Sequence, residues 1–289
     1  MRGRRIAERL MKWVFILASA ISIIAFLFIC YFIFKSGLPF LGKVGVFNVL
    51  GGSHWQPTHV PPQYGILPMI FGSVIITVLA CIIGVPFAIF SAIYLTWEVS
   101  KKVYAVLKPL LNLMAGIPSI VYGFFALQWI VPLVKDSLGG KGYSILTAAI
   151  LLGIMILPTI LSIAEAAIQA VPKFYYEASV ALGASHSRSV IHIVVPAAKS
   201  GILAAIILGV GRAIGETMAV SMVVGNQPRI TWNILKGIRT MTTNVVLEMG
   251  YAAGDHQKAL LATACVLFIF ILLINLTFLI IKKRGANNG

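Results

Sequence analysis

Six apolar runs, each long enough to cross a lipid bilayer, constrain this sequence more than any other feature. About 20 predominantly apolar residues span the hydrocarbon core as a helix. The runs cover residues 13–34, 68–96, 110–134, 143–163, 198–224 and 259–281. Because lipid offers the backbone no hydrogen-bond partner, we expect every run to be helical. The runs predict an all-α membrane protein with about six transmembrane helices.

The composition excludes an ordinary soluble domain and gives no sign of an enzyme. Apolar residues make up 59% of the chain and charged residues 11%, whereas globular chains carry about 25% charged residues. The three cysteines, Cys30, Cys81 and Cys265, lie inside apolar runs without metal-like spacing. The sequence contains neither a Walker A pattern nor an H-E-x-x-H pattern. We therefore expect no metal, no cofactor and no ATPase site in this chain.

The distribution of basic residues predicts how the chain is oriented. The formal charge is +15, but Lys and Arg are scattered through short connections, which favours a basic cytoplasmic surface over nucleic-acid binding. Most of them lie in the N-terminal segment, in the second-to-third and fourth-to-fifth connections and in the C-terminal tail. We expect a cytoplasmic segment 1–12, a transmembrane domain 13–281 and a cytoplasmic tail 282–289. The first run is too long for a signal peptide and is interpreted as an uncleaved helix.

The sequence also predicts where the long connections, several polar residues and the interior prolines lie. Segments 36–67 and 226–258 form long external connections, with Asp255 and His256 at the outer surface. Glu165 and Gln169 mark the end of the fourth helix. The interior prolines Pro86, Pro118 and Pro158 either kink their helices or belong to a transport pathway, and the pattern favours neither.

Residues 172–196 predict two short helices at an angle on the cytoplasmic surface. Pro172 suits a helix start and Gly183 a helix stop. Ser185 or Ser187 can cap a second helix, which runs toward Pro196 and is flanked by His186 and His192. The small residues Ala178, Ser179 and Ala181 would let another protein approach closely. On pattern alone, a docking helix and an interfacial helix without a partner are equally compatible with this segment.

This segment resembles the cytoplasmic motif of permease subunits in bacterial ABC importers. The matching residues are Glu177-Ala178-Ser179, Gly183, Ile193 and Val195-Pro196. Ser179 and Val195 replace the usual Ala and Leu conservatively. The resemblance implies a type I importer permease of the MetI-like class, in which Glu177, Ala178, Ser179 and Gly183 form a coupling helix that docks on a separate ATPase.

The fifth run contains a charged pair, Arg212 and Glu216, inside apolar sequence. On a helix, residues four apart share a face. A lone Arg near mid-membrane costs about 2.5–3.5 kcal/mol on insertion scales, so such residues usually face the protein interior or a wet cavity. The guanidinium fork matches oxyanions, although a structural salt bridge between helices is the alternative interpretation.

Three further segments resemble permease subunits of the bacterial phosphate importer, and the PstC type rather than the PstA type. They are residues 211–219, 115–123 and 64–68, with Trp55 and Pro57 upstream of the last. The resemblance implies that Arg212, Glu216 and Thr217 line the substrate pathway. It also implies three partners: a PstA-like second permease, a PstB-like ATPase and a PstS-like external phosphate-binding protein.

The leading functional hypothesis is a permease subunit of an ATP-driven importer of inorganic phosphate in the bacterial inner membrane. An importer of sulfate or molybdate is the alternative within the same class. A membrane-embedded enzyme would need a nucleophile or metal constellation, and none is visible. A passive channel would not need a coupling helix.

Overall fold

The computed structural model describes residues 2–287, and the side chains of residue 8, residues 10–278 and residue 280. Within this part of the chain, four helices are long and apolar enough to cross a membrane unbroken. They belong to α1 (Arg2–Val44), α3 (Leu67–Trp97), α7 (Ile145–Gln169) and α14 (Asp255–Asn287). They correspond to the first, second, fourth and sixth predicted runs.

The third and fifth predicted runs are helical but bent, which raises the number of spans to six if each bent pair is one span. In the third run, α4 (Lys101–Gly116) meets the segment of α5 (Ser119–Phe125), η1 (Ala126–Ile130) and α6 (Val131–Leu138) at 97°. Pro118 lies at this bend as the residue before α5. In contrast, Pro86 and Pro158 lie inside the continuous helices α3 and α7. Both runs are helical as expected, but the backbone breaks within residues 110–134 and within residues 198–224, so neither run is one continuous helix.

The fifth run is preceded by a group of short helices. These are α8 (Lys173–Ala181), α9 (His186–Ser189), η2 (Val190–Val194) and α10 (Val195–Ala197). The segment from α9 to α10 meets α11 (Lys199–Gly215) at an angle of 69°. The two short cytoplasmic helices predicted from the sequence thus correspond to α8 and the helical segment 186–197.

The connections at the opposite end hold further short elements. Residues 45–66 form α2 (Val46–Gly51) and a two-stranded antiparallel sheet of β1 (Trp55–Gln56) and β2 (Gln63–Tyr64), in which Trp55 pairs with Tyr64. The all-α prediction is correct except for this small sheet. Residues 224–254 contain α13 (Met241–Met249), and α12 (Met218–Val223) precedes them.

The core is built around α7, which packs against α3, α11 and α5. Glycines allow α3 and α7 to pack closely: a methyl group added to Gly84 would lie 2.6 Å from the Gly153 carbonyl oxygen. A second apolar cluster joins the end of α1, the sheet and the start of α14, and it includes Phe40, Trp55 and Leu260. In apolar helices of this kind, the faces with small residues pack against each other in the core, and the opposite faces contact lipid.

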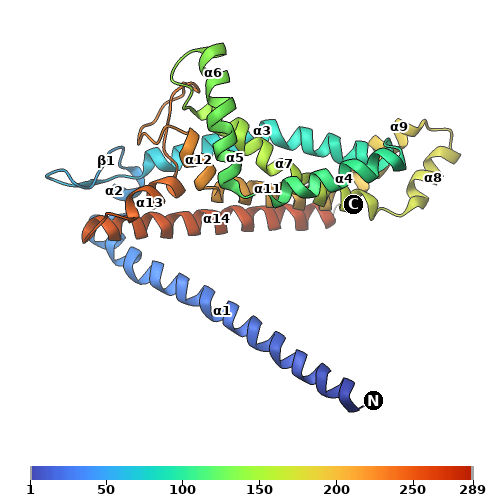
Figure 1. Ribbon diagram of the computed structural model, residues 1–289, viewed down its shortest axis with the longest axis horizontal. Coiled ribbons are helices and arrows are strands. Elements are labelled where there is room, and N and C mark those ends of the chain that lie inside the picture. The colour runs from blue at the N-terminus through green and yellow to red at the C-terminus, as the bar shows by residue number, and fades with distance from the viewer. Residues whose placement is uncertain (1, 288–289) are drawn as a thin grey trace.

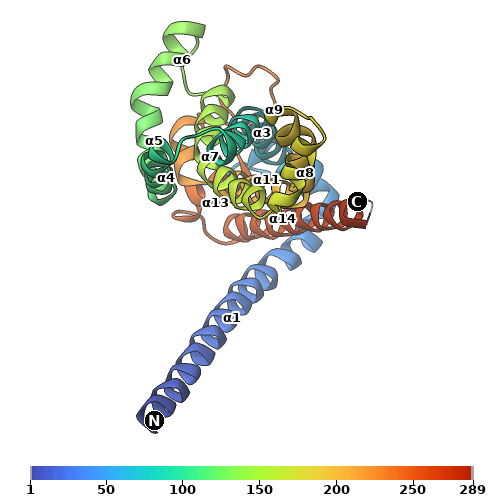
Figure 2. The ribbon, with the colours of Figure 1, turned by 90° about the vertical axis from the view of Figure 1, so that its right-hand side faces the viewer.

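Different elements lie at the two ends of the long axis of the molecule (Figure 1). The short helices α8 and α9 lie at one end, with the terminal ends of α1 and α14 toward the same side, and the β1–β2 hairpin lies at the other. Figure 2 shows α1 extending away from the remaining helices. The most apolar stretch of α1 contains no buried residue, whereas the end of the helix, with Phe40, packs in the second apolar cluster. An even number of crossings accounts for both ends of the chain lying toward one end of the molecule.

Candidate functional site

The break between α11 and α12 forms the centre of the candidate site. Helix α11 ends at Gly215, and Glu216 adopts an extended backbone conformation with φ −68° and ψ 128°. Arg212 therefore lies on α11, while Glu216 lies beyond its end. The prediction that these two side chains share one helix face was wrong, because that geometry requires a helix that continues through both residues.

Arg212 contacts the neighbouring core helix instead of Glu216. Its Nη1 atom donates a 3.0 Å hydrogen bond to Thr159 Oγ1 on α7. The residue is half-buried, and it forms no ion pair among the residues that the structure describes. A guanidinium has five N–H donors, so most of its donor capacity is left for a ligand or water. This arrangement does not support a salt bridge to Glu216.

Glu216 has a local structural task, which is to cap α12. Its Oε1 atom accepts hydrogen bonds from the backbone N–H groups of Thr217 at 3.2 Å and Ala219 at 3.3 Å. These are donors that a helix start leaves without intrahelical partners. Thr217 Oγ1 in turn donates to the Gly215 carbonyl at 3.0 Å. The charge and the hydrogen bonds of Glu216 and Thr217 thus stabilise the broken backbone itself.

Two of the sequence segments that resemble the phosphate importer meet at this break. On α5, a methyl group added to Gly123 would lie 2.8 Å from Ala219 Cα on α12. Only glycine permits this approach of the two helices. On the other side, Thr242 Oγ1 at the start of α13 donates to the Glu216 backbone carbonyl at 3.2 Å. The broken segment is therefore held between α5, α7 and α13.

The predicted coupling residues lie on and after α8. Glu177 is exposed, and Gly183 ends the helix with φ +87°, in a conformation that favours glycine. Ala178 is half-buried. Ser179 does not form part of a free surface, because its Oγ atom lies 2.9 Å from Ser189 Oγ on α9. Exposed apolar side chains surround these residues, including Phe174 and Leu182, whose exposed fractions are 73% and 90%.

A polar and aromatic cluster connects α8 to the end of α3. The Tyr176 hydroxyl lies 2.8 Å from His186 Nδ1, and His186 Nε2 lies 3.1 Å from Glu98 Oε1. The Trp97 ring packs against Tyr176 with 4.6 Å between ring centroids. Trp97 ends α3, and α3 packs along the core helix α7. A displacement of α8 would therefore act directly on a membrane-spanning helix.

Comparison with known families identifies the architecture. Residues 84–284 match the family described as binding-protein-dependent transport system inner membrane component. The chain belongs to this family. It is an ABC importer permease and a multi-pass inner-membrane protein.

Individual relatives agree with this assignment of the permease. The probable ABC transporter permease protein YqgH of Bacillus subtilis is 36% identical, covering 94% of this chain and 91% of that protein. The phosphate transport system permease protein PstC of Mesorhizobium japonicum is 32% identical, covering 79% and 76%. A permease chain of the bacterial alginate ABC transporter shares the fold, with a TM-score of 0.67, 15% identity and 94% coverage of both chains. The resemblance to PstC-type permeases and the expected importer fold are confirmed.

Sequence reasoning missed a buried ionic cluster at the end of the permease that carries the β1–β2 hairpin, which is called the outer end below after its predicted orientation. Glu248 on α13 accepts hydrogen bonds from Trp55 Nε1 at 2.8 Å and from Arg239, and His256 Nε2 lies 2.8 Å from its Oε2 atom. His256 is only 9% exposed, so its placement on the outer surface was a wrong prediction, whereas the Asp255 side chain is 39% exposed and pairs with Lys43. The cluster brings together residues distant in sequence, and no local spacing pattern predicts it.

The sequence predicted the position of Glu165 at the end of the fourth helix but not its burial or its partners, because those partners are also distant in sequence. Gln169 ends α7 as expected, but Glu165 is 1% exposed. Its carboxylate accepts hydrogen bonds from the Tyr104 hydroxyl and from Lys108 Nζ, both at 2.6 Å. The pair connects α4 to α7. A partly buried ion pair of this kind fixes geometry more than it adds stability.

Proposed function

We propose that this permease conducts inorganic phosphate in an ATP-driven importer, together with a second permease subunit of the PstA type. The observation that carries the proposal is Arg212, a half-buried cation without an ion-pair partner among the described residues, at a helix break inside a membrane span. An unpaired Arg at such depth in a membrane is unfavourable in free energy unless it faces a polar ligand or water. Its planar donor fork suits the oxygens of a tetrahedral oxyanion.

The PstC relative supports phosphate as the substrate, but YqgH carries no substrate in its name. Arg212, Glu216 and Thr217 are proposed to line the pathway, with Arg212 as the residue that contacts the anion. Glu216 and Thr217 hold the backbone break that places Arg212 beside it. This division of roles follows from their hydrogen bonds.

The partners follow from the architecture of the permease. A PstB-like ATPase would dock on α8 through Glu177, Ala178 and Gly183, with Ser179 holding α8 against α9. A PstS-like binding protein would deliver phosphate at the end that carries the β1–β2 hairpin and α13. The N-terminal segment 1–12, the coupling segment 172–196 and the tail 282–289 would then face the cytoplasm; residues 288 and 289 lie outside the described residues. The PstA-like permease would complete the pathway, and lipid would cover what remains of the exposed helix faces.

ATP-dependent uptake of labelled phosphate into liposomes tests the proposal. The liposomes contain this permease with its candidate PstA-like, PstB-like and PstS-like partners, and excess sulfate is added as competitor. We expect uptake that requires ATP and is unaffected by sulfate. Uptake blocked by sulfate would assign another oxyanion to the same architecture. Uptake without ATP would contradict the coupling role of α8.

A further inference from the structure

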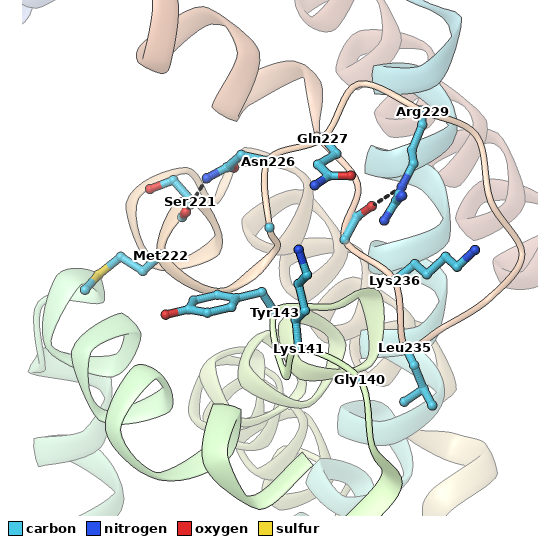
Figure 3. Close-up of a pocket in the computed structure, with 12 residues that line it drawn as sticks. Gly140, Lys141, Tyr143, Ser221, Met222, Asn226, Gln227, Arg229, Leu235 and Lys236 are labelled. Atoms are coloured by element: carbon cyan, nitrogen blue, oxygen red, sulfur yellow. Dashed lines mark hydrogen bonds between the residues drawn. The ribbon is translucent and has the colours of Figure 1, made fainter. Parts of the chain in front are cut away.

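A cationic pocket lies at the outer end of α12, away from Arg212. It has a volume of about 550 Å³. One wall comes from the loop between α6 and α7, with Lys141 and Tyr143, and the other from the loop between α12 and α13. Figure 3 shows Lys141 reaching from its loop toward Gln227, with Arg229 on the opposite wall.

All charged residues that line this pocket are basic. Lys141, Arg229 and Lys236 line it, and no Asp or Glu is among the lining residues. In the part of the chain that the structure describes, none of these three cations forms an ion pair. Gln227 and Ser221 add neutral polar groups to the lining. Like charges that converge without a counterion create a positive potential that attracts anions.

The pocket wall is a defined structure held by the core. Backbone N–H groups of Ser144, Ile145 and Leu146 donate to the carbonyls of Val223, Lys236 and Ile234, so the loop caps the start of α7. These amides are thereby occupied, and the cationic side chains remain as the groups available to an anion.

Glycines allow two segments of the α12–α13 loop to approach each other closely. Gly225 has φ +83°, and a methyl group on it would lie 3.0 Å from Gly237 Cα. Arg229 Nε donates to the Gly237 carbonyl at 2.9 Å, which fixes the arginine at the wall. Lys141 and Lys236 are exposed and make no side-chain hydrogen bond among the described residues. Their charges are therefore free to meet a ligand.

The pocket is connected to the candidate pathway through a single short helix. Ser221 lies on α12, which begins directly after Glu216 and Thr217. Six helical residues rise by about 9 Å. An anion in the pocket would be roughly two helical turns outward of the break that holds Arg212.

We propose that this pocket is an oxyanion site that takes inorganic phosphate at the outer entrance, before the anion reaches Arg212. The proposal rests on the proposed function, because it assigns phosphate a first binding site on the proposed transport pathway. Lys141 and Lys236 supply the charge, Arg229 supplies charge and a fixed donor fork, and Gln227 supplies a neutral donor. The attraction is electrostatic and weakens as ionic strength rises.

Equilibrium binding of labelled inorganic phosphate to the assembled importer tests this site. The assembly is placed in nanodiscs at low salt without nucleotide or binding protein. Every sample carries Arg212→Gln, so that the inner cation does not contribute. We expect saturable binding in this background. With Lys141→Gln and Lys236→Gln added, the affinity should fall at least roughly tenfold, because two of the three positive charges that attract the anion are removed.

Two controls separate charge from fold. Lys135→Gln removes an exposed cation of α6 that does not line the pocket, and it should leave phosphate affinity unchanged. Lys141→Arg with Lys236→Arg keeps the charge and should keep binding within about threefold, since Coulomb attraction depends on charge rather than on residue type. Absence of saturable binding in the Arg212→Gln background, or equal affinity in the Lys141→Gln/Lys236→Gln variant, would overturn the proposal.

The two proposals fail in different ways. If the wild-type assembly imports phosphate but the pocket substitutions leave phosphate binding unchanged, the entrance site is wrong and the transport function stands. If the pocket binds phosphate as expected but the wild-type assembly does not import it, the entrance site stands as an anion site and the transport function is wrong.

Discussion

At the scale of single residues, Arg212 and Glu216 have separate tasks although they belong to one sequence motif. Arg212 donates to Thr159 across the helix packing, and Glu216 caps the start of α12. A half-buried cation with spare donors is suited to a mobile anion, whereas a capping carboxylate is suited to hold the backbone. Substitutions that remove charge but keep shape distinguish these tasks.

We predict that Arg212→Gln abolishes phosphate uptake while the importer still assembles. Loss of one charged contact to a desolvated oxyanion costs about 2–5 kcal/mol, so uptake should fall at least roughly thirtyfold. Liposome uptake and co-purification of the subunits measure the two effects. Thr159→Val serves as the control, because it removes the hydrogen-bond partner of Arg212 but keeps the cation, and it should preserve most uptake. Failure of the Arg212→Gln importer to assemble would make Arg212 a structural residue.

At the scale of helices, the apolar runs predict most of the fold because lipid forces long apolar segments to be helical. The runs do not show where a helix breaks. Glycines and a proline stand at the breaks near Gly116 and Gly215, but Pro86 and Pro158 lie within unbroken helices. Whether such a residue bends the chain depends on neighbouring helices. At Gly215 the break is stabilised locally by Glu216, which caps α12, and from a distant part of the chain by Thr242 on α13.

The short helix α8 was predictable from its motif, but the exposed apolar side chains on and directly after it were not. We predict that Leu182→Ser weakens association with the ATPase and leaves the permease fold intact. Leu182 is 90% exposed, so truncation removes little internal packing. Loss of an apolar interface anchor commonly costs more than about 1 kcal/mol, and dissociation should increase at least roughly fivefold.

Surface-bound permease titrated with the purified ATPase measures this effect. Val60→Ser is the matched control, since Val60 is 94% exposed in the loop between β1 and β2, and Figure 1 shows β1 at the end of the molecule opposite α8. Equal affinities of the Leu182→Ser variant and the wild-type permease would place the docking surface elsewhere on α8. Glu177→Gln then tests the exposed carboxylate of the motif in the same assay.

At the scale of the whole molecule, the outer end is held together by one carboxylate that joins three distant parts of the chain. Glu248 connects the β1–β2 hairpin through Trp55, the α12–α13 loop through Arg239 and the start of α14 through His256. Burial alone would raise the pKa of Glu248. The hydrogen bonds from Trp55, His256 and Arg239, together with the Arg239 charge, outweigh burial and leave this pKa below its ordinary value of 4.5.

The lowered pKa predicts acid sensitivity of the outer end. A carboxyl whose pKa is lower in the folded state contributes stability above its unfolded pKa and loses it as pH falls through the folded pKa. The wild-type permease should therefore lose stability progressively as pH is lowered below 4.5. At pH 7, Glu248→Gln should destabilise the outer end by about 3–5 kcal/mol, because Arg239 is left without its buried counterion. The Glu248→Gln variant should not show the loss of stability at low pH that protonation of Glu248 causes in the wild type.

Thermal unfolding followed by tryptophan fluorescence measures both effects, since Trp55 donates directly to this carboxylate. Asp255→Asn is the control, because its pairs with Lys43 and Lys258 are exposed and exposed ion pairs contribute little. Equal pH dependence in the wild-type and Glu248→Gln proteins would show that the outer elements are held mainly by apolar packing around Phe40 and Trp55. A steeper acid transition in the wild type would show that the ionised Glu248 carboxylate stabilises the contacts among the β1–β2 hairpin, α13 and the start of α14.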